Sequence, residues 1–353
     1  MSIRIGFAGV GGMGQCAHLR NYASLEGCQV VALAEMHASK ARAVAQRYNV
    51  PKIYATIEEM VAREKLDGIV ASQPFSRHGV LVPALLKAKV PIFTEKPLAA
   101  SVPVGERLAA QVAASGTWHM VGYHKRSDPA TMYARREIER LQASGELGRM
   151  TYVRLSMPAG DWIASGFVDL LRGDDADRPD YKSLPGDPPD PAMDEATFQA
   201  YVRFVNYYIH QVNLVRHLLG EDYALSYADP AQVLLVGRSA GGVPCAIEMS
   251  AYTTSIDWQE SALVCFEKGW IRLDLPAPVA CNRPGQVTLF RDPRGDAAPQ
   301  TVVPQLPWVH AMRQQAMNFV AAIKGDAKPP CEAAEALLDL KLARDYIQLI
   351  GKA

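Results

Sequence analysis

Four polar side chains recur at helical spacing in an otherwise apolar stretch. They are Asn206, His210, Asn213 and His217, within residues 198–219. On one continuous helix these side chains form a single stripe, because residues three and four apart share a face. A histidine on such a stripe is either a hydrogen-bonded core residue or a group that takes and returns protons near neutral pH. The spacing alone leaves both interpretations open.

A lysine stands directly after a short apolar run that predicts a strand. Lys96 lies in the segment 94–99, which follows the run 91–94, and the segment 71–78 follows the run 68–71. Ligands bind beyond the carboxyl ends of the strands in an open parallel sheet, so we expect both segments at one ligand-binding edge. Lys96 there can hydrogen-bond a substrate hydroxyl or carbonyl. On composition alone, a single lysine before a proline is an ordinary surface-loop residue.

A glycine-rich turn links a strand pattern at 3–8 to a helix pattern that starts at Met13. The turn fits G-x-G-x-x-G with Gly9, Gly11, Gly12 and Gly14. The first glycine permits the tight turn, the second lets backbone N–H groups approach a pyrophosphate, and the third lets the helix pack against the strand. We predict that this turn, with Met13, binds a dinucleotide.

An acidic residue follows at the separation that such a site needs. Glu35 ends the apolar run 30–34, about 20 residues after Gly14. A carboxylate there accepts hydrogen bonds from the adenosine ribose and repels a 2′-phosphate. Because no arginine occurs at 36–38, we predict NAD rather than NADP. The alternative is a structural turn with a surface glutamate.

Positioning these residues requires a particular order of elements. Up to residue 122, short apolar runs alternate with helical patterns, which predicts an α/β Rossmann-type domain with a parallel sheet. From residue 151 onward longer runs succeed one another, which predicts an α+β domain with a large, mostly antiparallel open sheet. We expect residues 1–124 to bind the cofactor and residues 125–353 to bind substrate and mediate oligomerisation.

The composition narrows the function classes. The chain has 353 residues, with 37 basic and 37 acidic side chains, so no nucleic-acid binding through bulk charge is expected. No apolar stretch is long enough for a membrane span, and no signal-peptide pattern is present, so we expect a cytoplasmic protein. The six cysteines are scattered without C-x-x-C, which predicts reduced packing residues and no metal site.

Three motifs together resemble the glucose–fructose oxidoreductase/inositol dehydrogenase/MocA family. They are the glycine turn, the Gln73-Pro74 to His78 segment and Glu95-Lys96-Pro97. The resemblance is close over the first domain and looser over the second. It implies a place beside the nicotinamide for Lys96 and a cis bond before Pro97. It also implies cofactor contacts from Ser72, Gln73, Pro74, His78, Glu95 and Lys96. Residues 123–129 resemble the family's segment that crosses between domains, where Arg126 takes the position of an arginine near the active site.

The stretch 210–220 resembles the family's His-x-x-Asp helix, which implies that His210 is the proton acceptor. Asn206 stands where the family often has an aspartate, and Asn213 takes the second acidic position. An amide neither takes a proton nor stabilises an imidazolium by charge, so we expect Asn206 to orient substrate. The implied reaction is hydride transfer between a nicotinamide and a secondary alcohol of a sugar, inositol, related polyol or glycoside, without a metal.

Two other functions remain open. In one, tightly held NAD oxidises a sugar transiently during glycoside hydrolysis or elimination, as in some relatives. In the other, the chain senses NAD or a sugar without turnover; Lys96 and His210 argue against this, and Asn206 argues weakly for it. Trp162, after Asp161, is a candidate for stacking on a sugar face, and a core position is the alternative.

The segment 173–195 holds seven aspartates, one glutamate and five prolines, which predicts an exposed loop bordering the substrate pocket. An open antiparallel sheet commonly buries its free face against another subunit. We therefore expect a homodimer or homotetramer.

Overall fold

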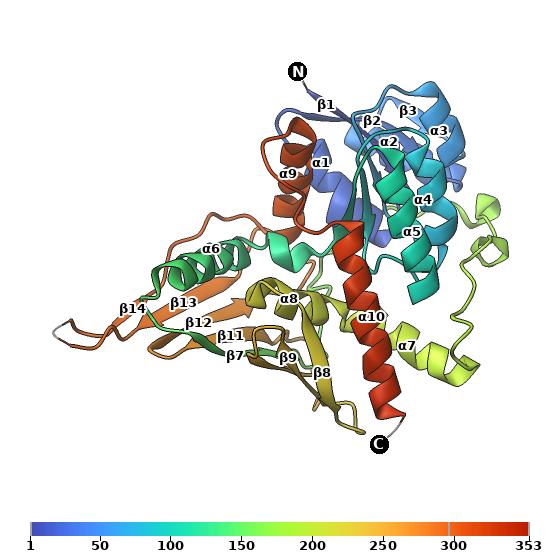
Figure 1. Ribbon diagram of the computed structural model, residues 1–353. Coiled ribbons are helices and arrows are strands. Elements are labelled where there is room, and N and C mark those ends of the chain that lie inside the picture. The colour runs from blue at the N-terminus through green and yellow to red at the C-terminus, as the bar shows by residue number, and fades with distance from the viewer. Residues whose placement is uncertain (1, 296, 352–353) are drawn as a thin grey trace. The chain divides into compact units, whose positions relative to one another are not determined.

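The computed structural model describes residues 2–295 and 297–351, which form two compact units (Figure 1). The first unit comprises residues 2–123, 166–206 and 315–341, and the second comprises residues 124–165, 207–314 and 342–351. The sequence-based boundary at 124 lies beside the first crossing between them. The chain then returns to the first unit twice, so no single boundary in the sequence separates the two units. Apolar patterns mark the elements, but they do not say which elements pack together.

The first unit contains a six-stranded parallel sheet in the order β3-β2-β1-β4-β5-β6, which confirms the Rossmann prediction. Its strands are β1 (Ile3–Ala8), β2 (Cys28–Ala34), β3 (Lys52–Tyr54), β4 (Gly68–Ala71), β5 (Ile92–Glu95) and β6 (His119–Gly122). The strand order reverses between β1 and β4. Their carboxyl ends therefore flank the crevice where sheets of this kind bind ligands.

Helical segments connect these strands where the patterns predict them. They are η1 (Met13–Leu19), α1 (Arg20–Ala23), α2 (Ala38–Tyr48), α3 (Ile57–Arg63), η2 (Phe75–Arg77), α4 (His78–Leu86) and α5 (Val102–Ser115). The helix predicted after the glycine turn starts as the π-helix η1 and becomes α-helical only in its last turn, α1. Gly116, with a φ of +75°, ends α5 in the left-handed conformation that glycine adopts most easily.

Aromatic rings form the centre of the first unit's core. Tyr22 meets Phe7 and Phe319 edge to face, with ring centroids 5.4 and 6.3 Å apart, and Phe93 meets Phe319 at 5.9 Å. Aromatic pairs favour this geometry. Phe319 comes from α9 (Ala311–Lys324), so a helix distant in sequence completes the core under the sheet that carries the glycine turn.

The second unit contains an eight-stranded sheet in the order β14-β13-β12-β11-β7-β10-β9-β8. Its strands are β7 (Met150–Ser156), β8 (Tyr223–Ala228), β9 (Leu234–Ser239), β10 (Pro244–Glu248), β11 (Glu260–Phe266), β12 (Gly269–Leu275), β13 (Gln286–Arg291) and β14 (Gln300–Val302). All neighbours are antiparallel except β7 and β10, which confirms the mostly antiparallel sheet. Burial alternates along β11, so one face of the sheet is packed.

Two helices pack on that face. The helix α6 (Pro129–Ser144) contacts β12 and β13, and α8 (Ile209–Leu219) contacts β7 and β10. The sequence reasoning missed α6, β8 and β14. The signals for α6 were present, because Asp128 and Pro129 begin it and Gly145 ends it. The last helix, α10 (Ala333–Ile350), belongs partly to each unit.

The single helix predicted over 198–219 is in fact two helices. α7 (Glu195–Tyr207) ends and α8 begins around Tyr208, whose backbone angles are φ −92° and ψ −3°. Asn206 lies on α7 in the first unit, whereas His210 lies on α8 in the second. The prediction of one continuous polar stripe is therefore wrong for Asn206. The apolar periodicity runs through the break, so the pattern did not reveal it.

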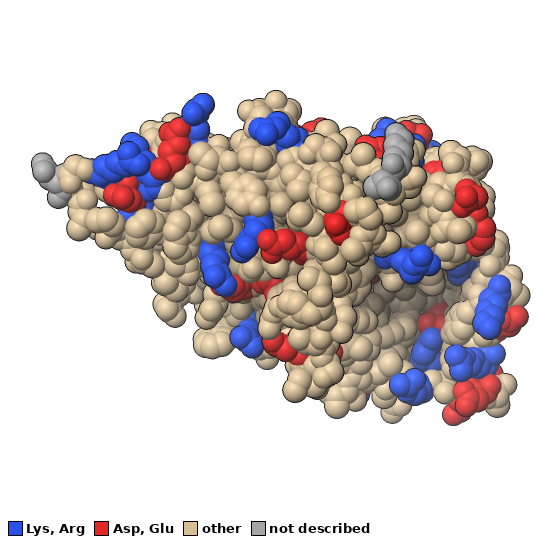
Figure 2. All heavy atoms as spheres, turned by 90° about the horizontal axis from the view of Figure 1, so that it is seen from below, with Lys and Arg blue, Asp and Glu red and all other residues tan. Residues whose placement is uncertain are grey.

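Charged side chains of both signs are interspersed on the face drawn in Figure 2, and neither sign gathers there into a large patch. The zero net charge is therefore not a balance of two opposed patches on that face. Among the described residues, no helix combines the length and the apolar character that crossing a membrane requires.

Candidate active site

The glycine turn has the geometry that its sequence predicts. Gly9 has a φ of +89°, and a Cβ on Gly14 would lie 2.5 Å from the carbonyl oxygen of Gly9. Glycine is therefore needed at both positions, first for the turn and then for close packing. A Cβ on Gly11 would meet nothing within 4 Å, so its backbone borders open space. This combination fits a pyrophosphate approaching the backbone at Gly11.

Glu35 lies beside this turn and is 8% exposed. Its carboxylate accepts hydrogen bonds from the N–H groups of Val10 at 3.1 Å and His37 at 3.0 Å. Lys40 Nζ lies 3.1 Å from Glu35 Oε2, and the Tyr181 hydroxyl donates to Oε1 at 3.4 Å. The carboxylate is thus fixed at the end of β2. Sequence reasoning missed Lys40 because it considered basic residues only at 36–38.

The segment 72–78 lies at the same edge of the sheet. The Ser72 N–H donates to the Ala8 carbonyl at 3.0 Å, and the Gln73 side-chain amide lies against Gly9. Pro74 precedes η2, and His78 begins α4 with its Nδ1 3.1 Å from the Leu98 carbonyl oxygen. Burial lowers the pKa of His78, which keeps its imidazole neutral at physiological pH. The structure thus brings this segment next to the glycine turn.

Glu95 ends β5 and Lys96 follows it, and the Lys96–Pro97 peptide bond is cis as the resemblance implied. Glu95 Oε1 lies 2.6 Å from Nε2 of His18, a residue of η1 that sequence reasoning missed. Burial alone would raise the pKa of Glu95, but the hydrogen bond and charge of His18, together with Lys96, hold it below its usual range. Lys96 Nζ donates to the backbone carbonyl of Asn206 at 2.5 Å, whereas the Asn206 side chain is exposed.

In the second unit, α8 faces the crossing segment η3 (His124–Ser127). The rings of His210 and His124 pack edge to face with centroids 4.5 Å apart. Arg126, 5% exposed, donates from Nε to Asn213 Oδ1 at 2.5 Å. Burial, with the nearby charges of Arg126 and Arg135, lowers the pKa of His217 well below its usual value. The α8 part of the predicted stripe therefore meets a polar network.

A buried ion pair supports this network and was not predicted. Lys125 pairs with Glu260 of β11, and both side chains are almost fully buried. Gln211 Nε2 donates to Glu260 Oε1 at 2.8 Å, and the Trp258 indole N–H donates to Oε2 at 3.2 Å. Since Lys125 adjoins His124 and Gln211 adjoins His210, these bonds fix the backbone that carries both imidazoles. No sequence signal joins residues so far apart along the chain.

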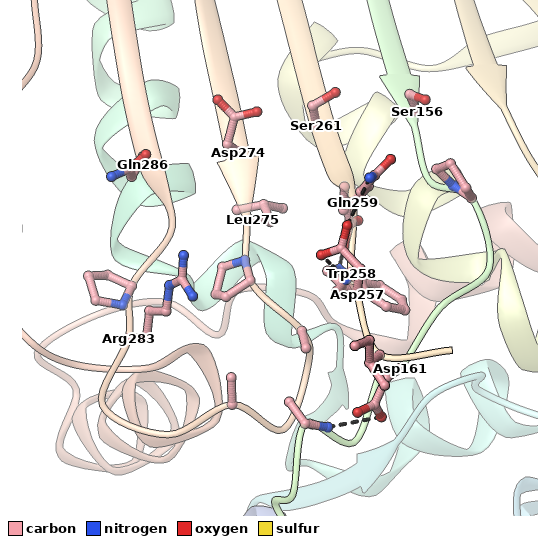
Figure 3. Close-up of a pocket in the computed structure, with 18 of the residues that line it drawn as sticks. Ser156, Asp161, Asp257, Trp258, Gln259, Ser261, Asp274, Leu275, Arg283 and Gln286 are labelled. Carbon is pink, nitrogen blue, oxygen red and sulfur yellow. Dashed lines mark hydrogen bonds between the residues drawn. The ribbon is translucent and has the colours of Figure 1, made fainter. Parts of the chain in front are cut away.

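A cavity of about 530 Å³ lies at one end of the second sheet (Figure 3). Residues in register on four neighbouring strands line it, namely Ser156, Ser261, Asp274 and Gln286. Asp161 also lines it, and its Oδ1 accepts the N–H groups of Ile163 and Ala164. Trp162 is half-buried and is not among the lining residues. Of these two adjacent residues, Asp161 therefore lines the cavity and Trp162 does not.

Comparison with known proteins places this geometry in context. Residues 3–123 match the family model GFO_IDH_MocA, an oxidoreductase family with an NAD-binding Rossmann fold. The inositol 2-dehydrogenase of Acidothermus cellulolyticus is 28% identical over 156 residues, which are 44% of this chain and 45% of that protein. The myo-inositol 2-dehydrogenase of Thermotoga maritima is 22% identical over 248 residues, covering 69% of this chain and 64% of that one. Both matches span less than two thirds of the relative.

The fold also recurs in solved structures. The aldose–aldose oxidoreductase of Caulobacter crescentus superposes with a TM-score of 0.69, covering 100% of this chain and 98% of that chain. The two sequences are 18% identical, so this likeness concerns the fold.

Proposed function

We propose that the chain is an NAD(P)-dependent sugar or polyol dehydrogenase or reductase, because residues 3–123 match the oxidoreductase family with an NAD-binding Rossmann fold. Its substrate would be a secondary alcohol of a sugar, inositol, related polyol or glycoside. The observation that carries the proposal is one sheet edge that assembles the glycine turn, Glu35, the segment 72–78 and Lys96. The inositol dehydrogenase relatives support the substrate class.

The residues present fit a dinucleotide, since the turn leaves open space at Gly11 and Glu35 stands fixed beside it. In this proposal Gly9, Gly11, Gly12, Met13 and Gly14 hold the pyrophosphate, and Glu35 holds the ribose hydroxyls. Residues 72–74, His78, Glu95 and Lys96 hold the nicotinamide half. The bound nicotinamide supplies the hydride chemistry. We favour NAD over NADP because the Glu35 carboxylate would repel a 2′-phosphate.

Lys96 is proposed to hold the reacting oxygen. Its ammonium already donates to the Asn206 carbonyl, which positions it, and Glu95 is occupied by His18. Asn206 would orient the substrate through its exposed amide. Holding a reactant in one orientation by itself lowers the activation free energy of the reaction, in addition to any effect of proton transfer.

His210 is proposed as the base that takes the hydroxyl proton as hydride leaves the adjacent carbon, and returns it in reduction. An imidazole suits this role near neutral pH. The His124 ring packs against His210, and we assign it as a positioning residue for that base. Arg126 is proposed to border the substrate from η3, where Asn213 fixes its guanidinium. Trp162 remains a proposed sugar-stacking residue.

A panel of sugars, inositols and glycosides incubated with NAD tests the function, with NADH absorbance and product release as the two readouts. We expect at least one compound to yield NADH in step with its oxidation. Glycoside cleavage without net NADH would instead indicate transient redox catalysis. Tight binding of a panel compound without any turnover would indicate a sensor.

We further propose a homodimer or homotetramer formed through the open face of the second sheet. On this face Trp270 and Phe290 stack with centroids 5.8 Å apart, and Leu263 lies half-exposed nearby, whereas α6 and α8 pack on the opposite face. A cytoplasmic location is also proposed. Its support is that the six cysteines form no disulfide in the part of the chain described by the structure.

A further inference from the structure

Residues 166–190, named here the strap, run along the carboxyl edge of the first sheet (yellow-green in Figure 1). The composition of 173–195 predicted an exposed loop bordering the substrate pocket. The strap has little regular structure beyond η4 (Asp175–Asp177) and η5 (Tyr181–Ser183). Many of its side chains are exposed, yet hydrogen bonds at Leu171, Asp177 and Asp187 join it to segments that follow the strands of the first sheet. The predicted exposure is therefore confirmed for most of this segment, and the hydrogen bonds that hold it in place were not predicted.

The strap begins at the glycine turn. A Cβ on Gly12 would lie 3.3 Å from the ring of Phe167, so this ring covers the turn. Leu171 then forms two hydrogen bonds with the Gln15 side chain: its N–H donates at 3.1 Å and its carbonyl accepts at 3.0 Å. The first part of the strap is thus held over the start of η1, where the pyrophosphate is proposed to bind.

The middle of the strap is held at the start of α2 by Asp177. Its carboxylate accepts from the Ser39 N–H at 2.7 Å, from the Ser39 hydroxyl at 2.6 Å and from His37 Nε2 at 2.9 Å. Ser39 and His37 together hold the pKa of Asp177 below its usual range. Asp174 adds two bonds from its backbone: its N–H donates to the Ser39 hydroxyl, and its carbonyl accepts from His37 Nε2.

Tyr181 then reaches Glu35, the proposed ribose acceptor. Its hydroxyl lies 3.4 Å from Glu35 Oε1, a long and weak hydrogen bond, and 3.2 Å from Lys40 Nζ. The Lys40 ammonium also lies 5.5 Å from the centre of the Tyr181 ring. The strap therefore covers Glu35, and the weak contact leaves Oε1 able to accept from a ribose hydroxyl.

The last part of the strap is held at the start of α4. Asp187 Oδ2 accepts from the Gly79 N–H at 3.0 Å, and the Asp187 N–H donates to the Ser76 carbonyl at 2.6 Å. Arg77 Nε donates to the Pro185 carbonyl at 3.0 Å. The strap thus passes the glycine turn, Glu35 and the segment 72–78 in order, which are the three places proposed to hold the dinucleotide.

We propose that the strap closes over the adenosine and pyrophosphate part of the bound dinucleotide, and that it must lift before the cofactor can exchange. This inference rests on the proposed dinucleotide site and is independent of the proposed substrate. Since Asp177 makes three bonds to α2 and its preceding turn, removing its carboxylate should free the middle of the strap. Exchange of the dinucleotide should then become faster.

The test is the dissociation rate of NADH, or of NADPH if that binds instead, measured by stopped-flow fluorescence without substrate. The matched control for Asp177→Ala is Asp175→Ala, because the Asp175 side chain is 96% exposed and its ion pair is with Arg178 of the strap itself, at 3.9 Å. We expect Asp177→Ala to raise the dissociation rate about tenfold or more, equal to about 1.4 kcal/mol. Asp175→Ala should stay within about twofold of the wild type, inside the usual spread for an exposed side chain.

A second readout does not depend on fluorescence. Arg172 and Lys182 are exposed tryptic sites within the strap, and bound NADH should slow their cleavage in the wild type but much less in Asp177→Ala. If Asp177→Ala does not fold, Ser39→Ala removes the hydroxyl that Asp177 accepts from and should likewise speed dissociation.

Equal dissociation rates for the two aspartate variants would overturn the proposal that the strap closes over the bound dinucleotide. So would tighter NADH binding by Asp177→Ala, since that would mean the strap blocks the site rather than closing over a bound cofactor. A wild-type chain that bound neither reduced nucleotide would refute the proposed cofactor site as well as the strap.

Discussion

Glu95 and Lys96 are adjacent at the end of β5, yet their side chains have different partners. Glu95 is held by His18, so its carboxylate has a hydrogen-bond partner inside the first unit. Lys96 donates to a backbone carbonyl, which can yield the ammonium to a substrate oxygen without leaving a buried carboxylate unpaired. This difference is consistent with the proposal that Lys96, rather than Glu95, also holds the reacting oxygen of the substrate.

Substituting Lys96→Ala or His210→Ala should each lower kcat by about 100-fold or more on an active substrate, because each removes a polar group proposed to act on the reacting hydroxyl. Steady-state assays on folded protein measure this. Lys87→Ala is the control, since Lys87 is an exposed lysine at the end of α4 and should retain wild-type turnover. Near wild-type kcat in both test variants would contradict the assigned site.

Replacing Glu35 by alanine should shift the cofactor preference. The change removes the ribose acceptor and leaves Lys40 without its carboxylate partner, beside the position of a 2′-phosphate. We expect the ratio of kcat/KM for NADP to that for NAD to rise about tenfold or more, or about 1.4 kcal/mol. An unchanged ratio would show that Glu35 does not set the preference.

Residues within continuous motifs could be placed from the sequence, because the chain itself positions them. The glycine turn, Glu35 and Lys96 follow strands directly, so their position at one edge followed from the predicted sheet. His18, Lys40 and Glu260 could not be placed in this way. Their roles depend on partners brought near by packing, and no spacing along the chain encodes that proximity.

Among the elements, the glycine turn contains two glycines whose substitution should have different effects, one on folding stability and the other on dinucleotide binding. Gly14→Ala places a Cβ 2.5 Å from a backbone oxygen and should destabilise the fold by about 1–3 kcal/mol. Gly11→Ala meets no atom within 4 Å and should leave the melting temperature unchanged. It should still weaken NADH binding, because its methyl group occupies the space proposed for the pyrophosphate. Calorimetry and titration together test this, and unaltered NADH affinity in Gly11→Ala would argue against the assignment.

The start of α6 should make stability depend on pH. Burial raises the pKa of Asp128 to about 6, although the N–H groups of Ala130 and Gly285 partly offset this. Its folded pKa is therefore above its unfolded one. The stability that protonated Asp128 contributes is present below about pH 4 and is lost as pH rises through 6, by up to about 3 kcal/mol.

Asp128→Asn keeps an acceptor for Ala130 but has no charge to bury. The free energy of unfolding of the variant minus that of the wild type should rise by about 1–2 kcal/mol between pH 5 and pH 7.5. Urea unfolding at the two pH values measures the difference. A difference that did not change with pH would show that Asp128 does not titrate in this range.

Most elements could be predicted from apolar periodicity, including every strand of the first sheet. The failures have physical causes. The break at Tyr208 preserves the apolar faces of α7 and α8, so periodicity cannot detect it. The helix α6 was overlooked despite its Asp128-Pro129 start, which shows that capping residues can carry information that a hydrophobic pattern does not.

At the scale of the whole molecule, the sequence predicted two sheets but not the returns of the chain. Residues 166–206 and 315–341 join the first unit because their side chains bond to its edge and complete its core. The composition of the strap indicated exposure, which is correct for many of its side chains. It gave no sign of the backbone and carboxylate bonds that hold it in place.

The proposed assembly predicts a defined mass in solution. Sedimentation equilibrium should give a dimer or a tetramer of the 38.5 kDa chain. Trp270→Asp should shift the mass towards the monomer, because it places a charge at the stacked pair on the open face of the second sheet. Glu139→Lys on α6, the helix that packs on the opposite face of this sheet, is an exposed charge substitution for comparison. A wild-type chain that sedimented as a monomer would contradict the proposed interface.

The proposed reaction of this chain is hydride transfer between a nicotinamide and a secondary alcohol. The most direct measurement compares, for one active sugar or polyol, the amount of NADH formed with the amount of ketone product formed. Hydride transfer to the cofactor should give equal amounts of the two products, and Lys96→Ala should lose both together. Product formation without a matching amount of NADH would contradict it.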